Sequence, residues 1–206
     1  MTKKQRAKIV LDELEKLYPE TPIPLDHTDA YTLLVAVALS AQTTDKKVNQ
    51  VTPSLFAVAN TPEKMAALEV PEIKELIKEI GLSNSKAKNL KLMAEVLVEK
   101  HQGVVPESFE LLEELAGVGH KTASVVMSQY FGHPAFPVDT HIHRLMKQWK
   151  LSEGKNVNQV ENDAKKLWPK EKWNSLHLQI IFYGREYSPA RGKKENDFIT
   201  EMLFAK

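Results

Sequence analysis

Two residues with complementary chemistry stand where helices are expected to begin. Lys121 follows the Gly-x-Gly turn of LAGVGHKTASVVMSQYFG (115–132), and Asp139 opens the segment DTHIHRL. A helix N-terminus disfavours positive charge, and an ammonium group placed there and stripped of water loses its proton more readily. The neutral amine is then a nucleophile. A carboxylate nearby could assist the proton loss or stabilise a developing sugar cation, so the pair predicts attack at an anomeric carbon to give a Schiff base.

The turn itself can serve a second purpose. Gly117 and Gly119 lack Cβ atoms, so the backbone can adopt positive φ and approach another surface closely. The first amides of the following helix have no partner within the helix and can bind a phosphate of a nucleic-acid backbone. The alternatives are an ordinary corner between two helices for the turn and a simple N-cap for Asp139.

Composition limits the other chemistry. The 206 residues carry a net charge of +1, with 42% apolar and 27% charged residues, as in ordinary globular proteins. They contain no cysteine, which excludes disulfides, a thiol nucleophile and thiolate-bound zinc or iron–sulfur sites. No apolar run is long enough to span a membrane, and the charged start MTKKQRAKIVLDELEKLYPE lacks the apolar core of a signal peptide. These features predict a cytoplasmic protein.

The apolar spacing is helical along nearly the whole chain, without the alternation typical of strands. Residues 2–18 carry apolar side chains at helical spacing, and Pro62 and Pro71 stand early in two short helices. Gly81 is expected to end the second of these. Further helices are expected after caps at residues 28–29, 44–45, 139 and 156, and over 84–103, 109–115, 120–132 and 172–187. The prediction is an all-α protein of roughly ten to twelve helices, forming two lobes.

Four segments together resemble a known family. LAGVGHKTASVV and VDTHIHRL, with LLVAVALSAQTTDKKVN and IGLSNSKAKNL, are similar to the helix–hairpin–helix and Gly/Pro-Asp motifs of DNA glycosylases, above all the endonuclease III family. The resemblance covers roughly residues 1–190. It implies two helical lobes with an active-site cleft between them. Residues 24–132 would form the lobe with the helix–hairpin–helix (about 109–132), and residues 1–23 with 133–206 the second lobe.

The resemblance also assigns roles to residues. Lys121 matches the Schiff-base lysine and Asp139 the essential aspartate. Gln42 matches a residue that enters the gap left by a flipped base, and Leu82 a wedge inserted into the base stack, because a vacated stack must be filled. Without the resemblance, Leu82 would be a core leucine and Gln42 a solvated helix end. Further DNA contacts are expected from Gly117, Gly119, His120, Thr122, His141, Arg144, Arg191 and Lys193.

The resemblance implies a site for a monovalent cation, whereas the sequence argues against a 4Fe–4S cluster. The carbonyls of Glu113, Leu115 and Val118 match those that often hold a monovalent cation, Na⁺ or K⁺. Relatives usually end in four cysteines that hold a 4Fe–4S cluster, and here the matching positions are Ser188, Glu195, Phe198 and Phe204. No 4Fe–4S cluster is therefore expected.

The segment without cysteines needs another way to hold its place. Packing by Phe198, Ile199, Met202 and Leu203 as a small amphipathic helix is expected to replace the cluster. Arg191, Lys193 and Lys194 would keep the surface positive for DNA. The alternative is a frayed tail whose charges are solvated.

The resemblance implies a monomeric base-excision-repair enzyme of the cytoplasm and nucleoid. It would remove oxidised pyrimidines from damaged duplex DNA and nick the strand 3′ to the abasic site by β-elimination. The alternative is a non-catalytic helix–hairpin–helix protein that keeps only the grip on DNA. A mere binder would need neither Lys121 nor Asp139.

Overall fold

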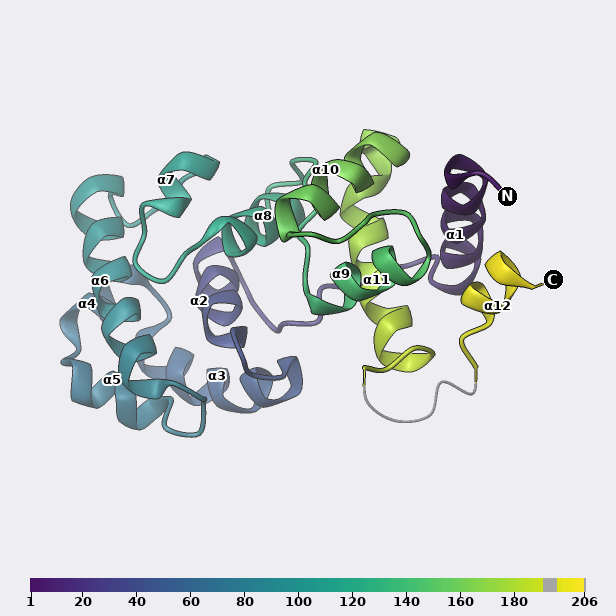
Figure 1. The fold of residues 1–206 in the computed structure, drawn as a ribbon. Coiled ribbons are helices and arrows are strands. Elements are labelled where there is room, and N and C mark those ends of the chain that lie inside the picture. The colour runs from purple at the N-terminus through teal and green to yellow at the C-terminus, as the bar shows by residue number, and fades with distance from the viewer. Residues whose placement is uncertain (191–195, 206) are drawn as a thin grey trace. The chain divides into compact units, whose positions relative to one another are not determined.

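The computed structural model describes residues 1–190 and 196–205, and throughout this range the regular structure is helical. Twelve α-helices and one short 3₁₀ helix follow one another there (Figure 1). Their bounds are α1 Lys3–Leu17, α2 Ala30–Ser40, α3 Asp45–Ala59, α4 Pro62–Ala67, α5 Val70–Leu76, α6 Ser83–His101, α7 Phe109–Glu113, α8 His120–Gln129, α9 Thr140–Gln148, α10 Val157–Leu167, η1 Lys170–Lys172, α11 Trp173–Glu186 and α12 Phe198–Phe204. The all-α prediction is confirmed.

The chain divides into two compact units, each with its own apolar core. Residues Ile23–Gly132 form one of them, which we call the hairpin unit and which contains α2 to α8. Residues Met1–Pro22 and His133–Lys206 form the other, which we call the terminal unit.

The hairpin unit is built around α2. Every residue from Tyr31 to Val37 is buried, and so is Leu39. A helix that is apolar on all sides needs neighbours on all sides, and α3, α6 and α8 pack against it, while α4 and α5 pack on α6. The central position of α2 means that its C-terminal end is fixed by the unit as a whole.

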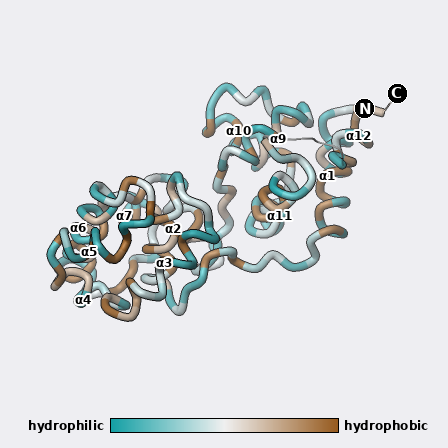
Figure 2. Tube along the Cα trace, turned by 90° about the horizontal axis from the view of Figure 1, so that it is seen from below, coloured by the Kyte–Doolittle hydropathy of each residue, from teal (hydrophilic) through white to brown (hydrophobic). Residues whose placement is uncertain are grey.

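The terminal unit is built around α11, which packs against α1 and α9. Trp149 and Tyr183 are its largest fully buried side chains. Residues Ala7, Val10 and Leu14 give α1 one buried side, and the alternation of brown and teal along this helix in Figure 2 shows the same amphipathic pattern. The two ends of the chain meet in this unit because α12 packs against α1.

Local signals placed most helix ends correctly. The side chains of Asp29, Thr44, Asp139 and Asn156 each accept a backbone amide at the start of a helix, as N-caps do. The prediction for Gly81 was wrong. The helix α5 ends at Leu76, where the next amide bonds to carbonyls of the last turn in a tightened geometry, and irregular turns lead on to Gly81.

No helix in the described part of the chain is both long enough and apolar enough to cross a membrane.

Candidate functional site

The hairpin joins α7 to α8 through two glycines with different surroundings. Gly117 has φ +80°, and a Cβ atom added there would lie 3.0 Å from the Asn89 side chain. Gly119 is the N-cap of α8, and a Cβ atom added there would meet nothing within 4 Å. The buried side chains of Leu115 and Val118 anchor the loop between them. Gly117 is thus required by the fold, whereas Gly119 leaves an open surface beside the first amides of α8.

Lys121 lies on the first turn of α8, and its side chain is exposed. Within the described part of the hairpin unit it has no hydrogen-bond or ion-pair partner. Its neighbour His120 pairs through Nδ1 with the Glu113 carboxylate at 2.9 Å, and Thr122 is half-buried. The hairpin unit therefore does not shield the Lys121 amine from water, contrary to the predicted desolvation, because the side chain on this first turn is exposed.

Gln42 and Leu82 have the same unusual backbone conformation. Their φ angles are +57° and +61°, and the only other described non-glycine residues with positive φ are Gln102 and Lys150. A branched apolar side chain in this region is strained, and such strain is concentrated at functional sites. Both side chains are exposed, and Leu82 keeps 57% of its surface accessible. The expectation that Leu82 might be a core residue is thereby excluded.

The loops that carry these two residues are neighbours in the hairpin unit. A Cβ atom added to Gly81 would lie 3.7 Å from the Gln42 carbonyl oxygen and 3.8 Å from Thr43 Oγ1. The Lys47–Glu79 ion pair joins the same two segments at the surface. The structure thus brings together two loops whose exposed residues, Gln42 and Leu82, are 40 positions apart in the sequence.

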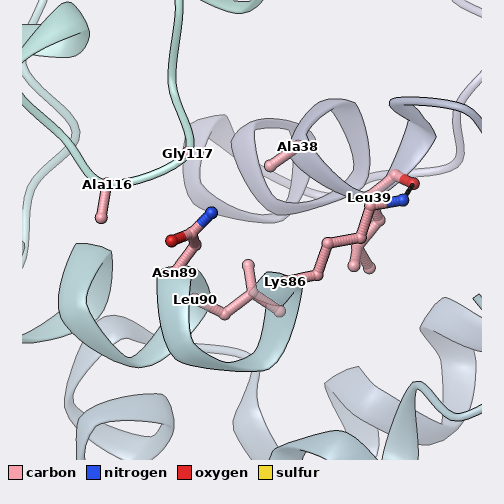
Figure 3. A pocket seen from close by; sticks show the side chains of 7 residues that line it. All are labelled: Ala38, Leu39, Lys86, Asn89, Leu90, Ala116 and Gly117. Carbon is pink, nitrogen blue, oxygen red and sulfur yellow. Dashed lines mark hydrogen bonds between the residues drawn. The ribbon is translucent and has the colours of Figure 1, made fainter. Parts of the chain in front are cut away.

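Lys86 lies outside the predicted set, yet it connects these loops. It is 8% exposed, and its Nζ atom donates to Leu39 O at 2.9 Å, Ala41 O at 2.6 Å and Thr43 Oγ1 at 3.2 Å. Figure 3 shows the side chain running from α6 to the end of α2. A signal for this burial was present in the sequence, because Lys86 shares the spacing of the buried residues Leu90 and Leu97 on α6.

A small cavity of about 20 Å³ separates α2, α6 and the hairpin, enough for about one water molecule. Its lining, drawn in Figure 3, consists of Ala38, Leu39, Lys86, Asn89, Leu90, Ala116 and Gly117. Ala116, which precedes Gly117 in the hairpin, belongs to this lining. The hairpin and the end of α2 are therefore close parts of one packed arrangement.

Asp139 lies in the terminal unit, at the start of α9. Its Oδ1 atom accepts the Ile142 amide at 2.8 Å, and the preceding segment, residues 135–138, is buried. Within the described part of that unit, Oδ2 has no hydrogen-bond partner. The cap and a chemical role are thus compatible, because each uses a different oxygen.

His141 and Arg144 follow on the same helix but turn inward. His141 packs against α11, where a Cβ atom added to Gly184 would lie 3.0 Å from its ring, and burial lowers the pKa of His141. The Arg144 guanidinium donates to the side chain and carbonyl of Ser188. Their observed contacts are internal, and the DNA contacts expected of both residues remain predictions.

Comparison with known proteins identifies the family. The family model "HhH-GPD superfamily base excision DNA repair protein" matches residues 35–170, more than half of the chain. The chain belongs to this superfamily. Endonuclease III of Haemophilus influenzae is 44% identical over 203 residues, which cover 98% of this chain and 96% of the relative. Endonuclease III of Escherichia coli is 43% identical with the same coverage.

Solved structures agree with this placement in the endonuclease III family. A trapped endonuclease III–DNA covalent intermediate matches with a TM-score of 0.91 and 39% identity, covering 94% of this chain and 92% of that chain. A thermostable thymine-DNA glycosylase matches with a TM-score of 0.82 and 26% identity, covering 98% and 94%.

The residues of this endonuclease III relative do not fit a 4Fe–4S cluster. The chain has no cysteine, and Ser188, at the first matching position, is fully buried and hydrogen-bonded to Arg144. Phe198 and Phe204 offer no ligand atom, and Glu195 lies outside the described residues. Among the residues that are described, no group of three or more His, Cys, Asp or Glu side chains could hold a metal ion.

The C-terminal segment is fastened by a buried carboxylate instead. Asp197 accepts Tyr183 Oη at 2.7 Å and Gln148 Nε2 at 2.6 Å, and it caps α12. Burial alone would raise the pKa of Asp197, but four polar side chains bring the pKa below its ordinary value; they belong to Ser188, Tyr183, Thr200 and Gln148.

The helix α12 itself follows the predicted pattern with one exception. Ile199 and Leu203 are buried and Phe198 packs against the core, so the expected amphipathic helix is present. The prediction for Met202 was wrong, because this side chain is 46% exposed on the outer side of the helix. The predicted basic residues Arg191, Lys193 and Lys194 lie outside the described residues.

Proposed function

We propose that this chain removes oxidised pyrimidines from duplex DNA and nicks the strand, with Lys121 as the nucleophile. Membership of the endonuclease III family makes it a base-excision-repair DNA glycosylase with AP lyase activity. The observation that carries the residue assignment is the exposed amine of Lys121, unpaired within the described hairpin unit, at the start of the helix that follows the glycine hairpin.

The first step places the damaged nucleotide outside the duplex. Leu82 wedges into the base stack and Gln42 fills the gap, so that lost stacking and pairing are partly replaced. Both side chains are exposed and lie on adjacent loops, which suits insertion from one side of the duplex. Bound DNA would supply the desolvation of Lys121 that its own unit lacks, and removal of water favours the neutral amine.

The second step is covalent. The Lys121 amine attacks C1′ of the sugar, the C1′–N bond to the base breaks, and the base leaves with a proton. The C1′–O4′ bond then breaks, O4′ takes up a proton, and the open-chain iminium that forms at C1′ makes the C2′ proton acidic. Loss of that proton breaks the bond between C3′ and its oxygen, which nicks the strand 3′ to the lesion. Asp139 serves as the base or stabilises the positive charge, and its Oδ2 atom remains for this purpose.

Backbone amides as well as side chains would bind the DNA phosphates. The amides that open α8, beside the open space at Gly119, would bind a phosphate. His120 and Thr122 would add contacts nearby. A monovalent cation at the carbonyls of Glu113, Leu115 and Val118 would support the hairpin. The enzyme would act on damaged DNA as a monomer, in the cytoplasm and nucleoid.

Borohydride trapping tests the assignment. On a duplex that contains thymine glycol, the reductant should link wild-type protein covalently to DNA, and Lys121→Ala should give no adduct. Lys100→Ala removes an exposed lysine on α6 and should trap like wild type. If the wild-type protein binds the DNA in a gel-mobility shift assay but forms no covalent adduct, the non-catalytic alternative is favoured. Equal trapping by Lys121→Ala would show that another amine reacts.

A further inference from the structure

Lys86 is the one buried ammonium group of the described hairpin unit, and no step of the proposed reaction uses it. Burying an ammonium group without a carboxylate is costly unless its protons are all hydrogen-bonded. Lys86 meets this requirement with three oxygens, and all three belong to the end of α2 or the loop that follows. Such an arrangement needs a reason beyond filling space, since an apolar side chain would fill it at less cost.

The carbonyls at the end of α2 explain what the ammonium group does. The last carbonyls of a helix have no partner within the helix. Val37 O accepts the Ser40 hydroxyl and Ser40 O accepts the Thr43 amide, whereas Leu39 O and Ala41 O accept Lys86. The negative end of the helix dipole also favours a cation there. Lys86 thus acts as the C-terminal cap of α2 from a distant part of the chain, and the capped turn leads directly into Gln42.

The backbone of Lys86 is hydrogen-bonded to the second loop, which carries Leu82. Lys86 lies in the first turn of α6, and its amide donates to the Leu82 carbonyl at 3.0 Å. The Ser85 hydroxyl donates to that carbonyl as well. Lys86 therefore contacts the Leu82 carbonyl through its amide. Its ammonium group contacts the Ala41 carbonyl before Gln42 and the Thr43 hydroxyl after it.

We infer that Lys86 is a positioning residue that holds the Gln42 and Leu82 loops at a fixed separation, so that both side chains enter the duplex together. The inference rests on the proposed function, because it concerns the step that opens the base stack. A residue of this kind should matter most when an intact damaged base must be flipped. It should matter less when the base is already missing, since an abasic nucleotide needs less unstacking.

The chain offers a matched control on the same helix. Lys91 donates from Nζ to the Ala66 carbonyl at 2.8 Å, at the end of α4. It has the same side chain, the same helix and the same kind of acceptor, but it ties no loop that carries Gln42 or Leu82. Lys86→Met and Lys91→Met therefore differ in which segment they release.

The experiment compares two activities and one structural readout. Single-turnover release of thymine glycol should fall about tenfold in Lys86→Met, while borohydride trapping on a preformed abasic site should change less than about threefold. Lys91→Met should alter neither. Amide hydrogen exchange should increase at residues 40–44 and 80–83 in Lys86→Met only. If both activities of Lys86→Met fall in parallel, the role is merely structural, and wild-type values throughout would overturn the inference.

Two further outcomes are separable. If the wild-type protein neither excises nor traps, the proposed function fails, and unchanged loop exchange in Lys86→Met would then overturn the tether as well. If Lys86→Met does not fold, Thr43→Ala removes only the side-chain acceptor of Lys86. It should raise exchange in the same two loops and lower the ratio of base release to trapping. An unchanged ratio and exchange in this variant would overturn the inference.

Discussion

A buried charge anchors an important segment in each unit, and the two charges differ in what they do for stability. Lys86 in the hairpin unit donates mainly to backbone carbonyls, and burial lowers its pKa. Asp197 in the terminal unit is surrounded by neutral donors that lower its pKa. The Lys86 side chain binds its proton less tightly in the folded chain than in the unfolded chain. The charged form of Lys86 therefore lowers the free energy of unfolding at neutral pH. The Asp197 charge adds to stability at the same pH.

The segments they hold explain the difference. Asp197 fastens α12, whose Ile199 and Leu203 contribute apolar burial to the terminal unit, so charge and packing serve the same end. Lys86 fastens two loops whose tips, Gln42 and Leu82, remain exposed in left-handed conformations. A costly charge that orders strained, exposed residues is typical of a functional site, whereas a favourable charge that seals a helix onto a core serves stability.

The largest effect is expected from Asp197→Ala. Loss of the carboxylate leaves buried donors of Tyr183 and Gln148 without an acceptor and removes the cap of α12. The free energy of unfolding should fall by about 3 kcal/mol, measured by urea denaturation. Asp12→Ala, which removes an exposed carboxylate on α1, should cost less than about 1 kcal/mol. Equal losses would remove the distinction between the anchor and an ordinary surface charge.

The hairpin sharpens the comparison because backbone geometry rather than charge holds it. Gly117→Ala puts a Cβ atom 3.0 Å from Asn89 at a φ of +80° and should cost about 2 kcal/mol of unfolding free energy. Gly119→Ala meets nothing within 4 Å and should cost less, about 1 kcal/mol, because alanine is a poorer N-cap than glycine. It should nevertheless weaken DNA binding in a fluorescence-anisotropy titration, because the methyl group fills the space proposed for a phosphate. Full affinity in Gly119→Ala would exclude that contact.

A smaller effect on stability is expected from Lys86→Met. Replacement of a buried charge by an apolar side chain of similar length is often neutral or stabilising, so the unfolding free energy should change by less than about 1 kcal/mol. The same chemical denaturation series as for Asp197→Ala measures it. A loss of the size seen for Asp197→Ala would make the two anchors equivalent and would remove the argument that Lys86 serves function.

The smallest expected effect is a difference in how the Asp197 and Lys86 charges change stability with pH. The folded pKa of Asp197 is depressed, so its contribution is complete above an unfolded pKa of about 4 and is lost as the pH falls through the folded value. The stability gap between wild type and Asp197→Asn should therefore narrow below about pH 4. The folded pKa of Lys86 is also depressed. The stability of the wild type should therefore increase relative to that of Lys86→Met as the pH rises toward about 10. Melting temperatures measured from pH 3 to pH 10 would check both slopes.

Local chemistry in the sequence determined much of this protein. Helix starts follow from caps such as Thr44, Asp139 and Asn156 because an N-cap side chain bonds to amides only two or three residues away. The same locality fixes the glycine hairpin before Lys121. The lack of cysteine excludes a thiolate-bound cluster without any coordinates. The resemblance of whole motifs then supplied the candidate site.

Tertiary structure decided which side of each helix is buried. Helical spacing places Lys86 on the buried side of α6. Only the packing of α6 against α2 determines that its ammonium group meets the carbonyls of Leu39 and Ala41. Arg144 turned inward and Met202 outward for the same reason. The anchor at Asp197 draws its partners from α9 and α11, which lie far away along the chain. Contacts of this kind depend on how distant helices pack together, and no local pattern of residues encodes them.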